Sequence, residues 1–262
     1  MSLLFAYRHI ILKYHNGSLR LASGKQQIVS GSGIIFLPLL LYFGVFESLS
    51  SLFIVSAMKI VGFLDDILGL SIRTRLILYL LAAAFILYLE NWLSTGWSVF
   101  LLLSIIYLFW VNAVNFMDGI NGMVVIQSLV IVLGLLWTNN IGDSALPTSI
   151  VAGLLAFSWF NVRKNAILYL GDAGSIGLGF FLGCLLFRNW HSLNSGHILI
   201  FVAVFVVDVS ATLLLRLWHR ENVFERHQAH LYQRLVYELG WSEILVSILY
   251  GLIQAALIIV WQ

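Results

Sequence analysis

The stretch GFLDDILGL (residues 62–70) places two adjacent carboxylates, Asp65 and Asp66, at the end of a long apolar run. A carboxylate in this position needs water, a cation or a partner, because its bare burial costs several kcal/mol. The stretches NAVNFMDGING and YLGDAGSIGLG repeat the arrangement with Asp118 and Asp172. The chain has only six aspartates, so four of them at the ends of apolar runs predict one shared polar site at a membrane surface.

The composition predicts an all-α, polytopic membrane protein. Of the 262 residues, 61% are hydrophobic and 10% are charged, and the mean hydropathy is +0.96. A soluble domain carries about a quarter of charged residues. The net charge of +2 is too small to indicate a nucleic-acid partner. The single cysteine, Cys184, excludes an internal disulfide and a CxxC metal site.

We expect about nine transmembrane helices in a single domain, residues 1–262, because a helix needs about 20 apolar residues to cross the bilayer. Residues 3–14 either form a short interfacial helix, which would be a tenth, or a frayed start. The expected spans are residues 28–46, 49–64, 76–90, 97–116, 122–138, 145–161, 173–190, 197–215 and 243–261.

The distribution of Lys and Arg predicts the orientation of these spans. One set of loops carries nearly all of these residues, and the opposite loops carry only Arg188. We therefore expect the basic loops to be cytoplasmic and the C-terminus to lie outside. With this topology the four aspartates all face the cytoplasm, which places the active site on that side of the membrane.

The polar residues have the chemistry of a hard metal site. Asn112, Asn115 and Asp118 recur every three residues, so they share one side of a helix end. Asp65 and Asp66 point about 100° apart on a helix, so we expect one to meet a metal ion and the other the substrate. Carboxylate and amide oxygens suit Mg²⁺, which commonly takes one or two protein carboxylates together with phosphate and water.

Two helix starts are candidates for binding a pyrophosphate. We expect a helix to begin at Asp118 and another at Gly171, each with free backbone N–H groups and a positive dipole end toward the cytoplasm.

Simpler interpretations exist for single residues. An Asp-Gly pair is usually a turn, His227 and His230 could be ordinary loop histidines, and Asp208 is either a buried hydrogen-bonded group or part of the polar site.

Four segments in order along the chain resemble the polyprenyl-phosphate N-acetylhexosamine-1-phosphate transferases, a part of glycosyltransferase family 4. They are FLDDILGL (63–70), NAVNFMDGINGM (112–123), FNVRKNAILYLGDAGSIGLG (160–179) and ERHQAHLYQRL (225–235). This family includes the transferases that initiate O-antigen synthesis and the phospho-N-acetylmuramoyl-pentapeptide transferase of peptidoglycan synthesis. The form HQAHLYQRL is most similar to the O-antigen branch.

The resemblance implies an enzyme of the bacterial inner membrane that requires Mg²⁺ or Mn²⁺. It would transfer a sugar-1-phosphate from a UDP-N-acetylhexosamine to undecaprenyl phosphate, releasing UMP and initiating O-antigen or another cell-surface glycan. Its partners are then these two substrates and the membrane lipid, and a homodimer is compatible with the family.

The resemblance also implies roles for individual residues. Asp65, Asp66, Asp118 and Asp172 would form the catalytic site, in which Asp172, Asp118 and Asp65 bind the metal. Substrate binding is assigned to Asn112, Asn115, Asn161, His227, His230, Arg226 and Lys25.

The sequence departs from the family pattern in the first loop and in one acidic motif. The usual PTPRGGG appears as IVSGSGI (28–34), and the usual DGIDG has Asn121 in place of its second aspartate. An inactive homologue is therefore one alternative, and a transporter is another. Transporters usually place their binding groups near the bilayer midplane, whereas the acidic groups here lie at span ends, which favours the enzyme.

Overall fold

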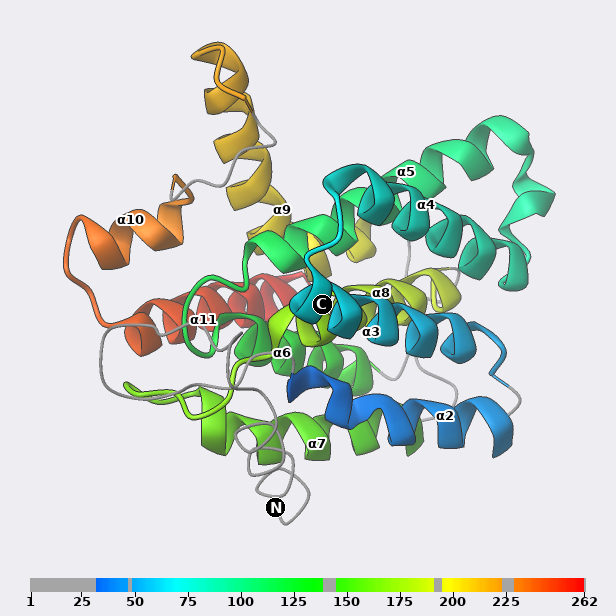
Figure 1. Ribbon diagram of the computed structural model, residues 1–262, viewed down its shortest axis with the longest axis horizontal. Helices are drawn as coiled ribbons and strands as arrows, with labels where there is room; N and C mark the ends of the chain where they lie inside the picture. The colour runs from blue at the N-terminus through cyan, green and yellow to red at the C-terminus, as the bar shows by residue number, and fades with distance from the viewer. Residues whose placement is uncertain (1–31, 47–48, 139–144, 191–194, 223–228, 262) are drawn as a thin grey trace.

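The structure, a computed structural model, describes residues 32–46, 49–138, 145–190, 195–222 and 229–261. Within these residues every secondary-structure element is a helix, so the all-α prediction is confirmed there (Figure 1). In chain order the elements are η1 (Ser32–Phe36), α2 (Leu37–Phe46), α3 (Ser51–Leu68), α4 (Ile72–Leu89), η2 (Trp92–Thr95), α5 (Trp97–Phe116), α6 (Met123–Trp137), α7 (Ala145–Asn161), α8 (Gly171–Arg188), α9 (Ser195–Trp218), α10 (Leu231–Tyr237) and α11 (Glu243–Val260).

Five helices are long and apolar enough to cross a membrane: α4, α5, α8, α11 and residues Ile198–Trp218 of α9. Shorter apolar helices cover Ser32–Phe46, Met123–Trp137 and Ala145–Asn161. Each of the nine expected spans overlaps a helix, while the number of crossings stays a prediction. The helix expected at residues 3–14 lies outside the described residues, and α10 was not predicted.

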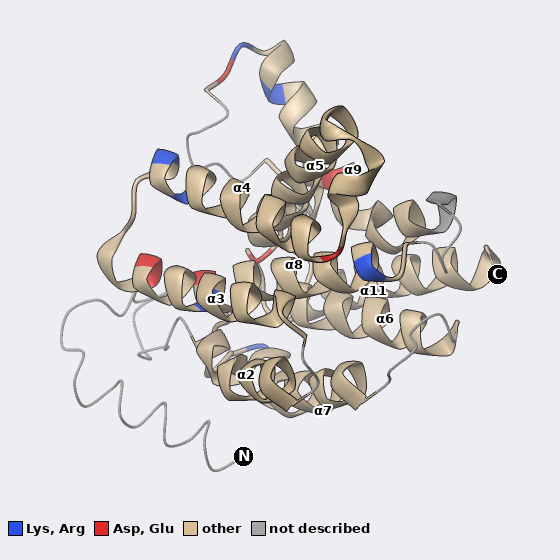
Figure 2. Cartoon of the chain, turned by 90° about the vertical axis from the view of Figure 1, so that its right-hand side faces the viewer, with Lys and Arg blue, Asp and Glu red and all other residues tan. Residues whose placement is uncertain are grey.

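The surface of the bundle is apolar along several helices. Large exposed side chains include Leu81 on α4, Leu101 on α5 and Leu214 on α9, each more than half exposed. Lipid can cover such a surface, whereas a soluble monomer rarely exposes so much apolar area. Figure 2 shows charged residues mainly at helix ends and connections, including the acidic end of α3 beside the basic start of α4.

Helix α8 is the centre of the bundle. Of the 18 residues of α8, 83% are buried, compared with 28% of the 18 residues of α4. It contacts α3, α4, α5 and α6, which lie around it in Figure 2. Close packing depends on glycine here, because a Cβ on Gly62 of α3 would lie 2.6 Å from the carbonyl oxygen of Asp172. The end of α3 therefore lies directly against the start of α8.

Replacing Gly62 with alanine should separate α3 from α8. Overpacking of this kind typically costs about 1–3 kcal/mol, so Gly62→Ala should lower the unfolding temperature measured in detergent. Ala57→Leu is the matched control, because it enlarges an exposed position of the same helix and should have little effect. Equal unfolding temperatures for the two variants would show that the contact at Gly62 is not tight.

Candidate active site

The end of α3 directs Asp65 toward α4. Gly69 ends the helix in a left-handed conformation (φ 67°) and donates its N–H to the carbonyl of Asp65. The Leu70 N–H then donates to Asp65 Oδ1 at 2.6 Å. The Ser71 side chain caps the start of α4, so the first turn of α4 brings Arg75 back over Asp65, with 2.9 Å between Nη1 and Oδ2.

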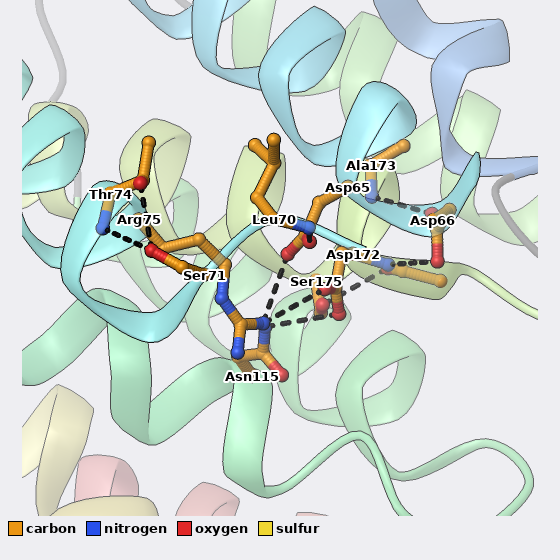
Figure 3. A network of polar contacts seen from close by, with 11 residues as sticks. Asp65, Asp66, Leu70, Ser71, Thr74, Arg75, Asn115, Asp172, Ala173 and Ser175 are labelled. Carbon is orange, nitrogen blue, oxygen red and sulfur yellow. Dashed lines mark hydrogen bonds and ion pairs between the residues drawn. The ribbon is translucent and has the colours of Figure 1, made fainter. Parts of the chain in front are cut away.

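Arg75 joins two carboxylates that are far apart in the sequence. The same Nη1 atom lies 3.4 Å from Asp172 Oδ2, and Asn115 Nδ2 donates to Asp172 Oδ1 at 3.2 Å. Figure 3 shows these side chains facing one another. The Asp65 side chain is 4% exposed, but Arg75 and Asp172 are 26% and 27% exposed, so the cluster is open to solvent on one side.

Asp66 has a different partner from Asp65, in agreement with the 100° between their directions. Its Oδ1 and Oδ2 accept the backbone N–H groups of Asp172 and Ala173, both at 3.1 Å. Asp66 thereby occupies the positive end of the α8 dipole. The prediction that the N–H groups at this helix start are free for a pyrophosphate is wrong for these two residues, because a carboxylate of the chain already binds them.

Asp118 lies in the connection between α5 and α6. The prediction that a helix begins at Asp118 is wrong, because residues 118–122 form turns and α6 begins at Met123. Burial raises the pKa of Asp118 well above its ordinary value, and the negative charges of Asp172 and Asp66 raise it further. Asp118 is therefore electrostatically part of the same cluster, and an added cation would favour its ionised form.

Asn161 fixes the Asp118 turn to the rest of the molecule. Asn161 Oδ1 accepts the Gly122 N–H at 3.0 Å, and its Nδ2 donates to the Leu168 carbonyl at 3.0 Å. The start of α6 is thus also bound by a side chain, and the amide of Asn161 is engaged with backbone. Asn112 donates to Leu108 O in its own helix, so within the described chain only Asn115 of the asparagine series bonds to the acidic cluster.

Asn121 ties the turn to two further segments. Its Nδ2 donates to the carbonyls of Arg163 and Lys164 at 3.2 and 3.5 Å. Its backbone N–H donates to Glu243 Oε2, and its carbonyl accepts from the Ser247 hydroxyl. Asn121, at a position where the resemblance implies an aspartate, is therefore a buried anchor between the α7–α8 connection and α11.

The histidine segment is held by a buried carboxylate. Asp208 of α9 accepts from His230 Nδ1 at 3.1 Å, from the Tyr250 hydroxyl at 2.6 Å and from the backbone N–H groups of Leu231 and Tyr232 at 3.2 and 3.4 Å. Asp208 is thus a buried hydrogen-bonded group, the first of the two interpretations that the sequence left open.

Three of the predicted substrate-binding residues, Lys25, Arg226 and His227, lie outside the described residues. Sequence reasoning used Arg75 only to assign topology and missed its position between two carboxylates. The Gly-Leu-Ser turn between α3 and α4 is a sequence signal that could have placed Arg75 near Asp65.

The cluster fits a divalent metal only if a substrate completes the coordination. Among the described residues, no three His, Cys, Asp or Glu side chains gather closely enough to hold a metal ion by themselves. Asp65 and Asp172 nevertheless converge on a single cationic nitrogen. Two carboxylates are the number that Mg²⁺ commonly takes from a protein, with substrate phosphate and water as further ligands.

Comparison with known proteins places these residues in a family context. Residues 48–189 match the model of glycosyl transferase family 4. The chain is 29% identical over 238 residues to a phospho-N-acetylmuramoyl-pentapeptide-transferase of Lactobacillus gasseri, covering 77% of this chain and 72% of the relative. It is 26% identical over 267 residues to the protein of that name from Lactococcus lactis subsp. cremoris, covering 87% and 78%. The match to the family model includes Asp65, Asp66, Asp118 and Asp172.

Asn121→Asp, which introduces the aspartate that the resemblance implies at this position, should destabilise this chain. A carboxylate oxygen would face the Arg163 carbonyl in place of an N–H donor, and leaving a buried acceptor unsatisfied costs about 1–3 kcal/mol. The deficit in unfolding temperature should shrink at acidic pH, because a protonated carboxyl can donate. Asn91→Asp, at an exposed position, is the control. An undiminished unfolding temperature in Asn121→Asp at neutral pH would contradict the anchoring role.

Proposed function

The chain belongs to glycosyl transferase family 4, and on that premise we propose that it transfers the sugar-1-phosphate of a UDP-N-acetylhexosamine to undecaprenyl phosphate, releasing UMP. The observation that carries the proposal is the convergence of Asp65, Asp172, Asn115 and Arg75 from four helices of an apolar bundle. A group of charges at the end of membrane helices suits a reaction between a lipid-bound phosphate and a water-soluble nucleotide.

The reaction needs no nucleophile from the protein. An oxygen of the lipid phosphate attacks the phosphorus attached to the sugar, a new P–O bond forms, and the bond to UMP breaks. Phosphoryl transfer depends mainly on positioning and on neutralising charge. The cluster supplies both, since its side chains are fixed by hydrogen bonds and include the guanidinium of Arg75.

The residues of the cluster have separable roles in this proposal. Asp65 and Asp172 would hold Mg²⁺ or Mn²⁺, with Asp118 close by. When bound, the metal offsets the negative charge that develops on the phosphate oxygens. Asn115 orients the Asp172 carboxylate through Nδ2. Asp66 acts by fixing the start of α8, and Asn161 by fixing the Asp118 turn, rather than by touching the reacting atoms.

The setting of the reaction follows from the same reasoning. We propose that the site faces the cytoplasm of a bacterial inner membrane, where UDP-sugars are made, and that the C-terminus lies outside. A homodimer is compatible with this arrangement. The HQAHLYQRL segment supports an O-antigen or related glycan as the product.

A second candidate has support from the relatives. Their name, phospho-N-acetylmuramoyl-pentapeptide-transferase, indicates a peptidoglycan precursor as the donor. The chemistry at the phosphate is the same, and the two candidates differ in the sugar portion of the donor. The transporter alternative has no support from the family match.

Membranes that contain the protein should release UMP from one UDP-sugar when undecaprenyl phosphate is present. The donor panel should include several UDP-N-acetylhexosamines and UDP-N-acetylmuramoyl-pentapeptide, which separates the two candidates. EDTA should abolish release and excess Mg²⁺ or Mn²⁺ should restore it. Absence of UMP release with every donor would reject the transferase, and full activity after thorough chelation would reject the metal.

Asp172→Asn should separate the charge of the cluster from its fold. Asparagine keeps the oxygen that accepts from Asn115, and the cap of α8 is supplied by Asp66. The variant should therefore accumulate normally but lose at least about two orders of magnitude in turnover, roughly 3 kcal/mol of barrier. Glu238 follows α10 and forms an exposed ion pair with Arg234 of that helix. Glu238→Gln should keep wild-type turnover. Near-normal turnover of Asp172→Asn at saturating metal would remove Asp172 from the mechanism.

A further inference from the structure

The hydroxyl of Tyr79 on α4 is buried and has no hydrogen-bond partner within the described part of the chain. The residue is 2% exposed. Buried polar groups in native proteins are nearly always paired, because desolvation without a partner costs stability. An orphan hydroxyl therefore needs an explanation.

Three other buried polar atoms share this condition but have simpler explanations. Ser56 and Ser128 lie in helices, where a serine hydroxyl can rotate toward a carbonyl of its own helix. Gln127 lacks a partner only at its acceptor Oε1, since its Nε2 donates to Gln254, and an acceptor does not bind a phosphate oxygen. A tyrosine hydroxyl stands at the end of a ring and cannot reach its own helix backbone, so Tyr79 needs a partner from elsewhere.

Tyr79 lies one helical turn along α4 from Arg75, a member of the acidic cluster. It follows Arg75 by four residues on α4, so the two side chains share one face of the helix. Side chains on a helix lean toward its N-terminus, which directs the phenol back toward the turn of Arg75. Its ring packs edge-on against Phe180 of α8, with 5.9 Å between centroids.

A second basic side chain contacts the first turn of α8. Lys59 of α3 is 1% exposed, and its Nζ donates to the Ala173 carbonyl at 3.3 Å. Arg75 and Lys59 thus both contact the first turn of α8. A guanidinium, an amine and an O–H donor without a partner are groups that bind a phosphoryl oxygen.

We propose that Tyr79 donates a hydrogen bond to a phosphoryl oxygen of the polyprenyl phosphate acceptor; this inference rests on the proposed function. Tyr79 lies about 6 Å farther along α4 than Arg75, at 1.5 Å per residue, inside a helix apolar enough to span the membrane. The isoprenoid tail keeps the acceptor in the membrane, so its phosphate meets the cluster from the side of Tyr79. The nucleotide pyrophosphate comes from water and meets the opposite side.

Tyr79→Phe tests the assignment because it removes only the hydroxyl. The KM for undecaprenyl phosphate should rise about tenfold or more, the loss expected for a hydrogen bond to a charged group. The KM for the UDP-sugar should stay within about twofold. Without ligands, the variant should unfold at the same temperature as the wild type or higher, since an unpaired group is removed. Tyr88→Phe is the matched control, because Tyr88 lies on the same helix and is exposed.

A binding measurement without turnover separates this inference from the proposed function. Undecaprenyl phosphate alone should raise the unfolding temperature of the wild type and of Tyr88→Phe, and raise that of Tyr79→Phe less. If UMP is never released but this pattern holds, the transferase is rejected and the phosphate contact stands. Equal stabilisation of all three proteins, or none, overturns the contact. If the UDP-sugar, and not the lipid, stabilises Tyr79→Phe less than the wild type, the assignment to the acceptor is overturned. If Tyr79→Phe without ligand unfolds at a lower temperature than the wild type, the hydroxyl has a structural role and the inference is also overturned.

Discussion

The carboxylate of Asp66, bound to the N–H groups of the second and third residues of α8, is the interaction on which the rest of the site depends. It satisfies two of the donors that a helix start leaves open and places a negative charge at the positive end of the dipole. Because Asp66 fixes the start of α8 against the end of α3, its neighbour Asp65 and the first-turn residue Asp172 are brought to one cation. Gly62 allows this approach by leaving room for the Asp172 backbone.

This arrangement concentrates negative charge where water is limited. Arg75 pairs with Asp65 and Asp172, and Asp66 binds the N–H groups at the start of α8. Burial raises the pKa of Asp118, and the negative charges of Asp172 and Asp66 raise it further. A site of this kind is stabilised by further positive charge, and it gains most from a divalent cation when phosphate supplies the remaining oxygen ligands. The charge imbalance and the chemistry of the proposed reaction therefore support each other.

The apolar periodicity of the sequence predicts the helices well, because it records which segments must be buried in lipid or protein. It also identifies the four aspartates, since carboxylates at the ends of apolar runs are costly without a function. It does not encode which partner a polar group meets across the bundle. For this reason the division of labour between Asp65 and Asp66 was left open, Arg75 was missed, and the helix starts were wrongly expected to be free. The backbone contacts of Asn161 depend in the same way on chain segments that meet only after folding.

A second buried carboxylate couples the histidine segment to the acidic turn. Asp208 fixes the start of α10 through His230 and the N–H groups of Leu231 and Tyr232. The Tyr232 hydroxyl then donates to the Phe116 carbonyl at the end of α5, two residues before Asp118. A charged group deep in a membrane helix is expensive unless its oxygen atoms are saturated with donors, and Asp208 meets that condition. Its position in α9 is therefore explained by the need to hold α10 against the Asp118 turn, which links the end of the chain to the site built by α3, α4 and α8.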